Sequence, residues 1–294
     1  MTSPPPPDPP LRVALVGAGR VGTAVAGRLR TAGHEIAGVW SRSDASIARA
    51  QSVLDAPSGS IDEVVADADL VLLGTPEAAL VKLGGEIAGS ISERSVVCHF
   101  SGSVGIGPLS SVTSAGLCAL HPVASFPDER TGSLRLEGVA WGRTCSAGLE
   151  AWADALVRRD LGGVPIAVAE DDRPVWHAAA VTTANGTAAL LAAGEALLRS
   201  VGVRDPWQVI GPLTAGVLAN ASELGVTAAL TGPIERGDAH VVERHLEALR
   251  ERTPSLLPLY LAASWSVFLA AEREGRLDPE SSRRLRASLS TTWR

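Results

Sequence analysis

Histidine is the residue type best suited to acid–base chemistry in this sequence, because its ordinary pKa of about 6.5 allows proton exchange near neutral pH. Of the six histidines, His121 lies in a His-Pro dipeptide where a short apolar segment ends, and His177 opens an Ala-rich segment that also contains Asn185. We expect His121 or His177 to supply a proton and Asn185 to orient a substrate hydroxyl or carbonyl. A histidine that caps a loop backbone is an equally good interpretation of His121.

A glycine-rich turn follows the first apolar segment of the chain. A Gly-x-Gly-x-x-Gly sequence begins at Gly17, between a predicted strand at 13–16 and a predicted helix at 23–32. In dinucleotide-binding folds these glycines allow a tight turn, close approach of a pyrophosphate and close helix packing, while the helix N-terminus faces the phosphates. The strand before and the helix after favour a cofactor site. The residues expected to form it are Gly17, Gly19, Arg20, Val21 and Gly22.

The end of the second predicted strand, residues 36–40, distinguishes between the two nicotinamide cofactors. Enzymes that bind NAD place an acidic residue there to hold the ribose hydroxyls. This chain has Ser41, Arg42 and Ser43 instead. A guanidinium and two hydroxyls suit the negatively charged 2′-phosphate, which a carboxylate would repel. We therefore predict NADP(H) as the cofactor.

Three further loops are expected at the same edge of the sheet, because ligands of open α/β sheets lie at the carboxyl ends of the strands. The loop that contains His121 is one of them, and His99 begins another. We expect His99 to contact the substrate, although a buried strand-end residue is an equally good interpretation. The residues of these loops that are expected to contact the cofactor are Thr75, Pro76, Ser101 and Gly102.

The predicted helix at 173–200 has one face of small residues that is interrupted by Thr182 and Asn185. Residues eight positions apart on a helix lie about 80° apart around its axis, so His177 and Asn185 can border one cleft. We expect Thr182 to contact the substrate there. Close helix packing through alanine is the simpler interpretation of this face.

The loop at 231–238 contains two more candidates, Thr231 and Arg236. The arginine fork suits a substrate carboxylate, because it donates two parallel hydrogen bonds. Asp238 is well placed to cap the helix that follows. The alternative is a capped turn whose Arg236 is solvated.

The elements that carry these residues fall into two groups. Up to about residue 170, short apolar segments alternate with helical patterns, which is typical of a doubly wound α/β fold with a parallel sheet covered on both faces. We predict a disordered Pro-rich tail at 1–10, an NADP(H)-binding Rossmann domain at 11–170 and an all-helical domain for substrate binding and dimerisation at 171–294. The predicted strands are 13–16, 36–40, 70–73, 96–100, 118–120, 139–141 and 166–169, and the predicted C-terminal helices are 173–200, 206–224, 238–252, 255–274 and 279–289.

Composition narrows the classes of partner. The chain has 294 residues, of which 46% are hydrophobic and 20% charged, and a formal net charge of −6. Nucleic acids and anionic membranes bind clustered Lys and Arg, so we expect a small molecule instead. The cysteines Cys98, Cys118 and Cys145 are too few and too irregularly spaced for a disulfide scaffold or a zinc site. No signal peptide or uninterrupted apolar stretch of about 18 residues is evident, so a cytoplasmic protein is predicted.

Several of these segments resemble the 6-phosphogluconate dehydrogenase-like superfamily, which includes pyrroline-5-carboxylate reductase, prephenate dehydrogenase and ketopantoate reductase. The chain is most similar to a family of Rossmann-like proteins with a helical C-terminal domain of unassigned function. The residues that carry this resemblance are Gly17 to Gly22, His99 with Ser101 and Gly102, His121 with Pro122, His177 to Asn185, and Ala229 to Asp238.

The resemblance implies an NADPH-dependent oxidoreductase that reduces a small anionic carbonyl acid, with 2-dehydropantoate (ketopantoate) as the first candidate. It also implies a homodimer that pairs through the helical domain. Lysine-based members of the superfamily carry a helix lysine four residues before an asparagine, and Val181 occupies that position relative to Asn185. The missing lysine favours one alternative, a regulator that binds NADP(H) without catalysis. The His-Pro dipeptide favours the other, a prephenate-dehydrogenase-like or imine-reducing enzyme.

Overall fold

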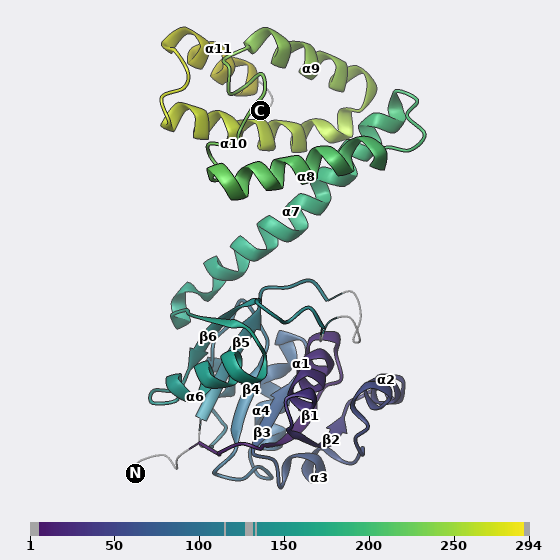
Figure 1. The fold of residues 1–294 in the computed structure, drawn as a ribbon, viewed down its shortest axis with the longest axis vertical. Helices are drawn as coiled ribbons and strands as arrows, with labels where there is room; N and C mark the ends of the chain where they lie inside the picture. The colour runs from purple at the N-terminus through teal and green to yellow at the C-terminus, as the bar shows by residue number, and fades with distance from the viewer. Residues whose placement is uncertain (1–5, 115, 127–131, 133, 291–294) are drawn as a thin grey trace. The chain divides into compact units, whose positions relative to one another are not determined.

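The computed structural model describes residues 6–114, 116–126, 132 and 134–290 (Figure 1). It divides into two compact units, Met1–Ala184 and Asn185–Arg294, and each is described by itself below. Strands give way to helices between residues 167 and 173, near the predicted boundary at 170. The boundary between the two compact units nevertheless lies later in the chain, between Ala184 and Asn185, because the helix that begins at Arg173 continues from one unit into the other.

The first unit is built on a seven-stranded sheet with the order β2-β1-β3-β4-β5-β6-β7. The chain moves from β1 outward to β2 and then crosses back to β3, on the other side of β1. This reversal is the topological switch point of a doubly wound fold. The strands are β1 (Arg12–Val16), β2 (Glu35–Trp40), β3 (Leu70–Leu73), β4 (Val96–His99), β5 (Gly116–Pro122), β6 (Ala140–Cys145) and β7 (Val164–Ala167).

The predicted α/β fold class is confirmed, but the sheet is parallel only as far as β5. β6 runs antiparallel to β5, and β7 runs parallel to β6. The expectation of a fully parallel sheet is therefore wrong at this edge. A short apolar segment has the same pattern in both directions, so the sequence carries no signal for the reversal.

Helices cover both faces of this sheet. On one face, side chains of β1 and β3 such as Leu15 and Leu72 pack with α1 and α6. On the other face, the alternate side chains, such as Val16 and Val71, pack with α3 and α4. This alternation follows from the two-residue repeat of a strand. The helices of the first unit are α1 (Arg20–Thr31), α2 (Asp44–Leu54), α3 (Ile61–Val65), α4 (Leu80–Ile87), α6 (Glu150–Ala155) and the start of α7 (Arg173–Ser200).

The second unit is entirely helical over its described residues. Its core is formed by α9, α10 and α11, with Phe268 and Leu285 among the fully buried side chains. Asp238 caps α9 as predicted, since its carboxylate accepts from the backbone N–H of Val241 at 3.3 Å. The helices are the end of α7, α8 (Trp207–Leu224), α9 (Ala239–Arg252), α10 (Leu257–Arg273) and α11 (Pro279–Ser290), all within two residues of the predicted ends.

One helix in the described part of the chain, Pro254–Arg273, is long and apolar enough to cross a membrane by length and composition alone. Leu257, Leu261 and Phe268 on this helix are buried in the core of the second unit. A core helix of a globular domain has this composition as well.

The N-terminal segment also differs in part from the expectation. Residues 1–5 of the predicted disordered tail lie outside the described residues, whereas Pro7 contacts the first unit and residues 8–10 are exposed. Pro7 is buried, and its carbonyl accepts a hydrogen bond from Trp152 Nε1 at 2.9 Å. A Pro-rich segment without apolar periodicity gives no sign of such a contact, because the partner lies 145 positions away.

Candidate functional site

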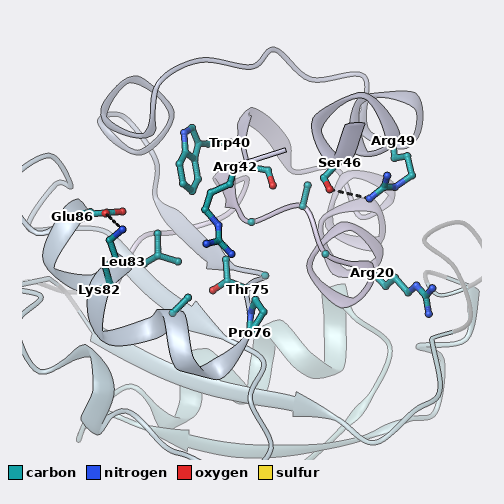
Figure 2. Close-up of a pocket in the computed structure, with 16 residues that line it drawn as sticks. Arg20, Trp40, Arg42, Ser46, Arg49, Thr75, Pro76, Lys82, Leu83 and Glu86 are labelled. Carbon is teal, nitrogen blue, oxygen red and sulfur yellow. Dashed lines mark hydrogen bonds and ion pairs between the residues drawn. The ribbon is translucent and has the colours of Figure 1, made fainter. Parts of the chain in front are cut away.

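A cavity of about 600 Å³ lies at the carboxyl ends of β1, β2 and β3, beside the switch point of the sheet (Figure 2). Its walls come from the loops after these strands and from α2 and α4. This is the sheet edge at which open α/β folds bind ligands. The lining residues are Gly17, Ala18, Gly19, Arg20, Trp40, Ser41, Arg42, Ser46, Arg49, Gly74, Thr75, Pro76, Ala79, Lys82, Leu83 and Glu86.

The glycine-rich turn forms one wall of this cavity. Gly17 has a φ of +88°, and a Cβ atom on it would lie 2.1 Å from Cγ2 of Thr75. A Cβ atom on Gly22 would lie 2.8 Å from Cα of Gly74, so α1 packs closely on the sheet. The N-cap of α1, Gly19, provides no side-chain capping bond, and the first turn of the helix contains no acidic residue. The free backbone N–H groups of that turn are therefore available to an anion.

The charged side chains that line the cavity are mainly cationic. Arg20 and Arg42 form no ion pair with any residue that the structure describes, and Figure 2 shows Arg42 directed toward Thr75. Lys82 lies 3.4 Å from Glu86, the one carboxylate among the lining residues. Oγ1 of Thr75 is buried and has no hydrogen-bond partner within the described residues. A free helix N-terminus, two unpaired guanidinium groups and a buried hydroxyl without a partner all fit a phosphate-bearing ligand.

Some of the residues that the sequence predicted to bind the cofactor line this cavity, and the others lie outside its lining. Ser43 lines neither of the cavities described here and is the exposed residue before α2. Ser46 and Arg49 line the cavity from α2, joined by a hydrogen bond of 2.9 Å, and they were not predicted. Their place in the first turns of the helix after the second strand is a signal that could have found them. The predicted residues that line the cavity are Gly17, Gly19, Arg20, Ser41, Arg42, Thr75 and Pro76.

A second cavity of about 510 Å³ adjoins the first and contains both candidate histidines, His121 and His177. Three residues that were expected to contact the cofactor, Val21, Ser101 and Gly102, line this second cavity instead. A ligand in the first cavity and a ligand in the second would therefore contact the same wall residues. The residues common to both linings are Gly19, Arg20, Gly74, Thr75 and Pro76.

His121 and His177 meet edge to face in the second cavity, with 5.6 Å between ring centroids and an angle of 88° between ring planes. Nδ1 of His121 accepts a hydrogen bond from Nε1 of Trp176 at 3.0 Å, so the proton of the neutral ring is on Nε2. Burial, followed by the charges of His177 and Arg173, lowers the pKa of His121 to about 4. The ring is therefore neutral at pH 7 and can donate a hydrogen bond through Nε2.

A carboxylate that the sequence analysis did not single out, Glu77, lies beside the histidines. Its Oε2 accepts from Oγ of Ser101 at 2.5 Å and also from Oγ of Ser103. These hydrogen bonds lower the pKa of Glu77 below its ordinary value, with Ser101 making the larger contribution. Glu77 is therefore ionised at neutral pH. It was missed because Glu77 and the serines are adjacent only after β3 and β4 pair.

His99, which was expected to bind substrate, has a structural role in the described fold. It is fully buried, its Nε2 donates to the carbonyl of Gly105 at 2.7 Å, and its Nδ1 accepts from the N–H of Ser101 at 3.2 Å. Burial lowers its pKa to about 4. With both ring nitrogens engaged by the backbone, the side chain shapes the loop that carries Ser101 instead of facing a ligand.

Arg173, the first residue of α7, is a further residue that sequence reasoning missed. Its guanidinium is fully buried and donates to the carbonyls of Ser101, Ala119 and Gly142 at 2.5, 3.4 and 3.3 Å. It also donates to Oγ1 of Thr144 at 3.1 Å. One side chain therefore ties the loop after β4 to β5, β6 and the start of α7. An arginine at a helix start gives no hint of this in the sequence.

The remaining candidates lie elsewhere. Thr182 is exposed on α7 at the end of the first unit, and Asn185 is exposed on the same helix at the start of the second unit. Thr231 and Arg236 are exposed in the loop before α9. None of these four side chains lines the two cavities of the first unit, so their contact with substrate stays a prediction.

Comparisons with known sequences identify both parts of the chain. Residues 4–122 match the profile of a Rossmann-like domain. Residues 142–266 match a domain of unknown function, DUF2520. The two matched regions follow one another along the chain. This confirms the predicted pairing of a Rossmann-like domain with a helical C-terminal domain of unassigned function. A comparison with curated protein sequences found no match.

Solved structures share the fold over most of the chain. A candidate NADP oxidoreductase from Bacteroides fragilis is 24% identical, covers 88% of this chain and 98% of its own, and gives a TM-score of 0.75. A protein from Thermotoga maritima is 20% identical over 90% of this chain and 99% of its own, with a TM-score of 0.69. A reductive aminase from Aspergillus terreus, solved with NADPH and ethyl levulinate, is 19% identical over 97% of this chain and 99% of its own, with a TM-score of 0.66. The likeness to these three structures is one of fold.

Proposed function

We propose that the first cavity binds NADP(H). The free N-terminus of α1 suits the pyrophosphate, and Arg42 with Ser41, after β2, suits a 2′-phosphate. Arg49 and Ser46 add a second cation and hydroxyl from α2. The similar fold of a reductive aminase solved with NADPH supports this choice.

A titration of the full chain with NADPH and NADH, followed by cofactor fluorescence, tests the proposal. We expect NADPH to bind at least tenfold more tightly, and Arg42→Ala to weaken NADPH much more than NADH. Arg30→Ala removes an exposed arginine that lines neither cavity, so it is the matched control and should change neither affinity. Equal affinities of the unmodified chain for both cofactors would refute the preference.

We further propose that the chain is an NADPH-dependent oxidoreductase that reduces a small carbonyl compound in the second cavity. The observation that carries this proposal is the wall of five residues shared by the two cavities, which would bring a cofactor and a substrate into contact. NADPH, when bound, supplies a hydride. Neutral His121 can polarise a carbonyl by donating a hydrogen bond from Nε2 to its oxygen. His177, which forms no hydrogen bond with a described residue, is then the better candidate for the proton donor.

Oxidation of NADPH in the presence of a panel of 2-oxo acids tests this activity, beginning with ketopantoate. The double variant His121→Ala/His177→Ala should lose turnover and keep its affinity for NADPH. The unmodified chain could instead bind NADPH while none of the carbonyl or imine compounds causes its oxidation. A cofactor-binding regulator would then be the better interpretation.

Reduction of an imine is the second candidate, and Glu77 favours it. An ionised carboxylate in the second cavity attracts a cationic iminium group and repels the carboxylate of a 2-oxo acid. A mixture of ketone and amine should then be reduced faster than a 2-oxo acid. Glu77→Gln should lower activity toward the iminium substrate and raise activity toward the 2-oxo acid.

We also propose that the chain forms a homodimer through the helical unit. No residue of α8 is buried, although the helix carries Trp207, Leu213, Leu218 and Leu224, each 63 to 66% exposed. Exposed apolar side chains in such number are typical of a subunit interface. Trp265, in contrast, packs against the core of its own unit. Sedimentation of the unmodified protein should give the mass of two chains. The double variant Leu213→Glu/Leu218→Glu should give the mass of one chain. A single-chain mass at micromolar concentration for the unmodified protein would contradict the dimer.

A further inference from the structure

Three cysteines lie side by side across adjacent strands of the sheet. In the strand register, Cys98 of β4 pairs with Cys118 of β5, and Cys118 pairs with Cys145 of β6. All three are free thiols. Cys98 and Cys118 are buried, whereas Cys145 is partly accessible to solvent. Although their spacing in the sequence is irregular, the three cysteines therefore form a row across the sheet. Neither proposed function uses this row.

The pair of Cys118 and Cys145 has the geometry for a cross-strand disulfide. The N–H of Ser146 donates to the carbonyl of Leu117 at 2.9 Å, so these two residues lie at a hydrogen-bonded position of the strand pair. The next position, Cys118 opposite Cys145, is therefore a non-hydrogen-bonded one. Non-hydrogen-bonded pairs of antiparallel strands bring Cα atoms to about 4.5 Å and their side chains close together. Disulfides span Cα separations of about 4.4–6.8 Å. The two sulfur atoms can therefore bond without a change in strand pairing.

Arg143 distinguishes Cys145 from the other two thiols. Its Nη1 donates to Sγ of Cys145 at 3.4 Å, and Asp154 holds the same guanidinium through a contact of 2.6 Å to Nε. A fixed cation beside a sulfur atom stabilises the thiolate, which is the reactive form of cysteine. The hydrogen bond from the thiol of Cys118, followed by that from Arg143, lowers the pKa of Cys145 to about 7. Burial raises the pKa of Cys98 to about 12.

We propose that Cys145 is a modification site for hydrogen peroxide, and that its oxidised form is resolved by Cys118 into a reversible disulfide. The Cys145 thiolate attacks one oxygen of the peroxide, the O–O bond breaks, and hydroxide leaves, which gives a sulfenic acid. The sulfur of Cys118 then attacks the sulfenic sulfur. Its proton leaves with the hydroxyl group as water, and the S–S bond forms. The product joins β5 to β6 three residues before His121.

Peptide mapping of the full chain after treatment with hydrogen peroxide tests the proposal. We expect a cross-linked peptide that contains Cys118 and Cys145, lighter by two hydrogens than its two thiol peptides and reversed by dithiothreitol. Cleavage after Phe100 separates Cys98 from Cys118, so the partner of Cys145 can be identified. Cys98→Ala is the matched control and should leave the cross-link intact. Cys118→Ala should instead accumulate a sulfenic acid on Cys145 that dimedone traps.

The rate of alkylation by iodoacetamide gives an independent measurement on the reduced protein. The rate at Cys145 should rise with a midpoint near pH 7, and Arg143→Gln should move the midpoint toward the ordinary value of about 8.5. At pH 6 that change corresponds to a roughly tenfold or greater loss of rate. A midpoint near 8.5 in the unmodified chain, or peroxide treatment that yields no cross-link between Cys118 and Cys145, would overturn the proposal.

Discussion

The indole N–H of Trp176 points at Nδ1 of His121, with 3.0 Å between the two nitrogen atoms. A Cβ atom on Gly142 would lie 2.6 Å from the same indole, so the ring of Trp176 lies directly on β6. The orientation of the indole is therefore fixed by the sheet, and the indole in turn fixes which nitrogen of His121 carries the proton. This relationship makes His121 a hydrogen-bond donor toward the second cavity.

Trp176→Phe should release the tautomer of His121, because phenylalanine keeps a ring over Gly142 and removes only the donor. We expect the neutral His121 ring to change from one tautomer to a mixture of both. Long-range nitrogen–proton NMR spectra of the imidazole distinguish the two forms. Trp207→Phe, on the exposed α8, is the control. An unchanged His121 spectrum in Trp176→Phe would show that the indole does not set the tautomer.

Arg173→Met should destabilise the first unit strongly. The variant leaves the carbonyls of Ser101, Ala119 and Gly142 without their buried donor, which costs about 3 kcal/mol or more in the free energy of unfolding. Arg199→Met is the comparison within the same helix. Arg199 pairs with Glu195 at 2.7 Å on the surface, so its loss should change stability by about 0.5 kcal/mol or less. Urea unfolding measures both, and similar values for the two variants would contradict a structural role of Arg173.

Two glycine-to-alanine substitutions should have opposite effects. At Gly22 the added methyl group would meet the backbone of Gly74 at 2.8 Å, which cannot move away, so we expect a loss of about 1–3 kcal/mol and weaker NADPH binding. At Gly85, inside α4, a methyl group meets nothing within 4 Å, and alanine should stabilise the helix by about 0.5–1 kcal/mol. Thermal unfolding and cofactor titration of both variants test the difference. A neutral Gly22→Ala would mean that α1 is not held against the sheet at this point.

Stability should fall in mild acid. His99 and His121 have pKa values of about 4 in the folded chain, below the ordinary 6.5. As the pH falls below 6.5, the unfolded chain binds protons that the folded chain cannot, so the free energy of unfolding decreases toward pH 4. The contribution of the two neutral histidines to stability is present in full only above pH 6.5. The melting temperature between pH 6.5 and 5, above the range where carboxylates titrate, measures this effect. His121→Gln should flatten the slope, and a melting temperature independent of pH in the unmodified chain would contradict it.

The sequence was informative where a local pattern determines the structure. The glycine turn at Gly17 is set by backbone geometry, and the apolar periodicity of the C-terminal half predicted α7 to α11 closely. Ser41 and Arg42, which follow β2, also line the cavity beside the switch point, as the order of the strands requires. Asp238 is a further case, since a cap depends only on the three residues that follow it.

Contacts between distant segments could not be predicted in this way. Glu77 meets Ser101 across 24 positions, and Arg173 meets Ser101 across 72. His99 shows the same limit, because the sequence placed it correctly at a strand end but could not show that Gly105 would fold back to engage its ring. Buried polar networks of this kind depend on strand pairing and loop closure, which leave no periodic signal.

The wall shared by the two cavities has a kinetic consequence. Gly19, Arg20 and the residues from Gly74 to Pro76 face both spaces, so an occupant of the first cavity completes the surface that a ligand of the second one meets. Binding should then follow a compulsory order, with the nucleotide first and the reducible compound second. Product inhibition patterns would display that order, and affinity for the second ligand alone should be hard to detect.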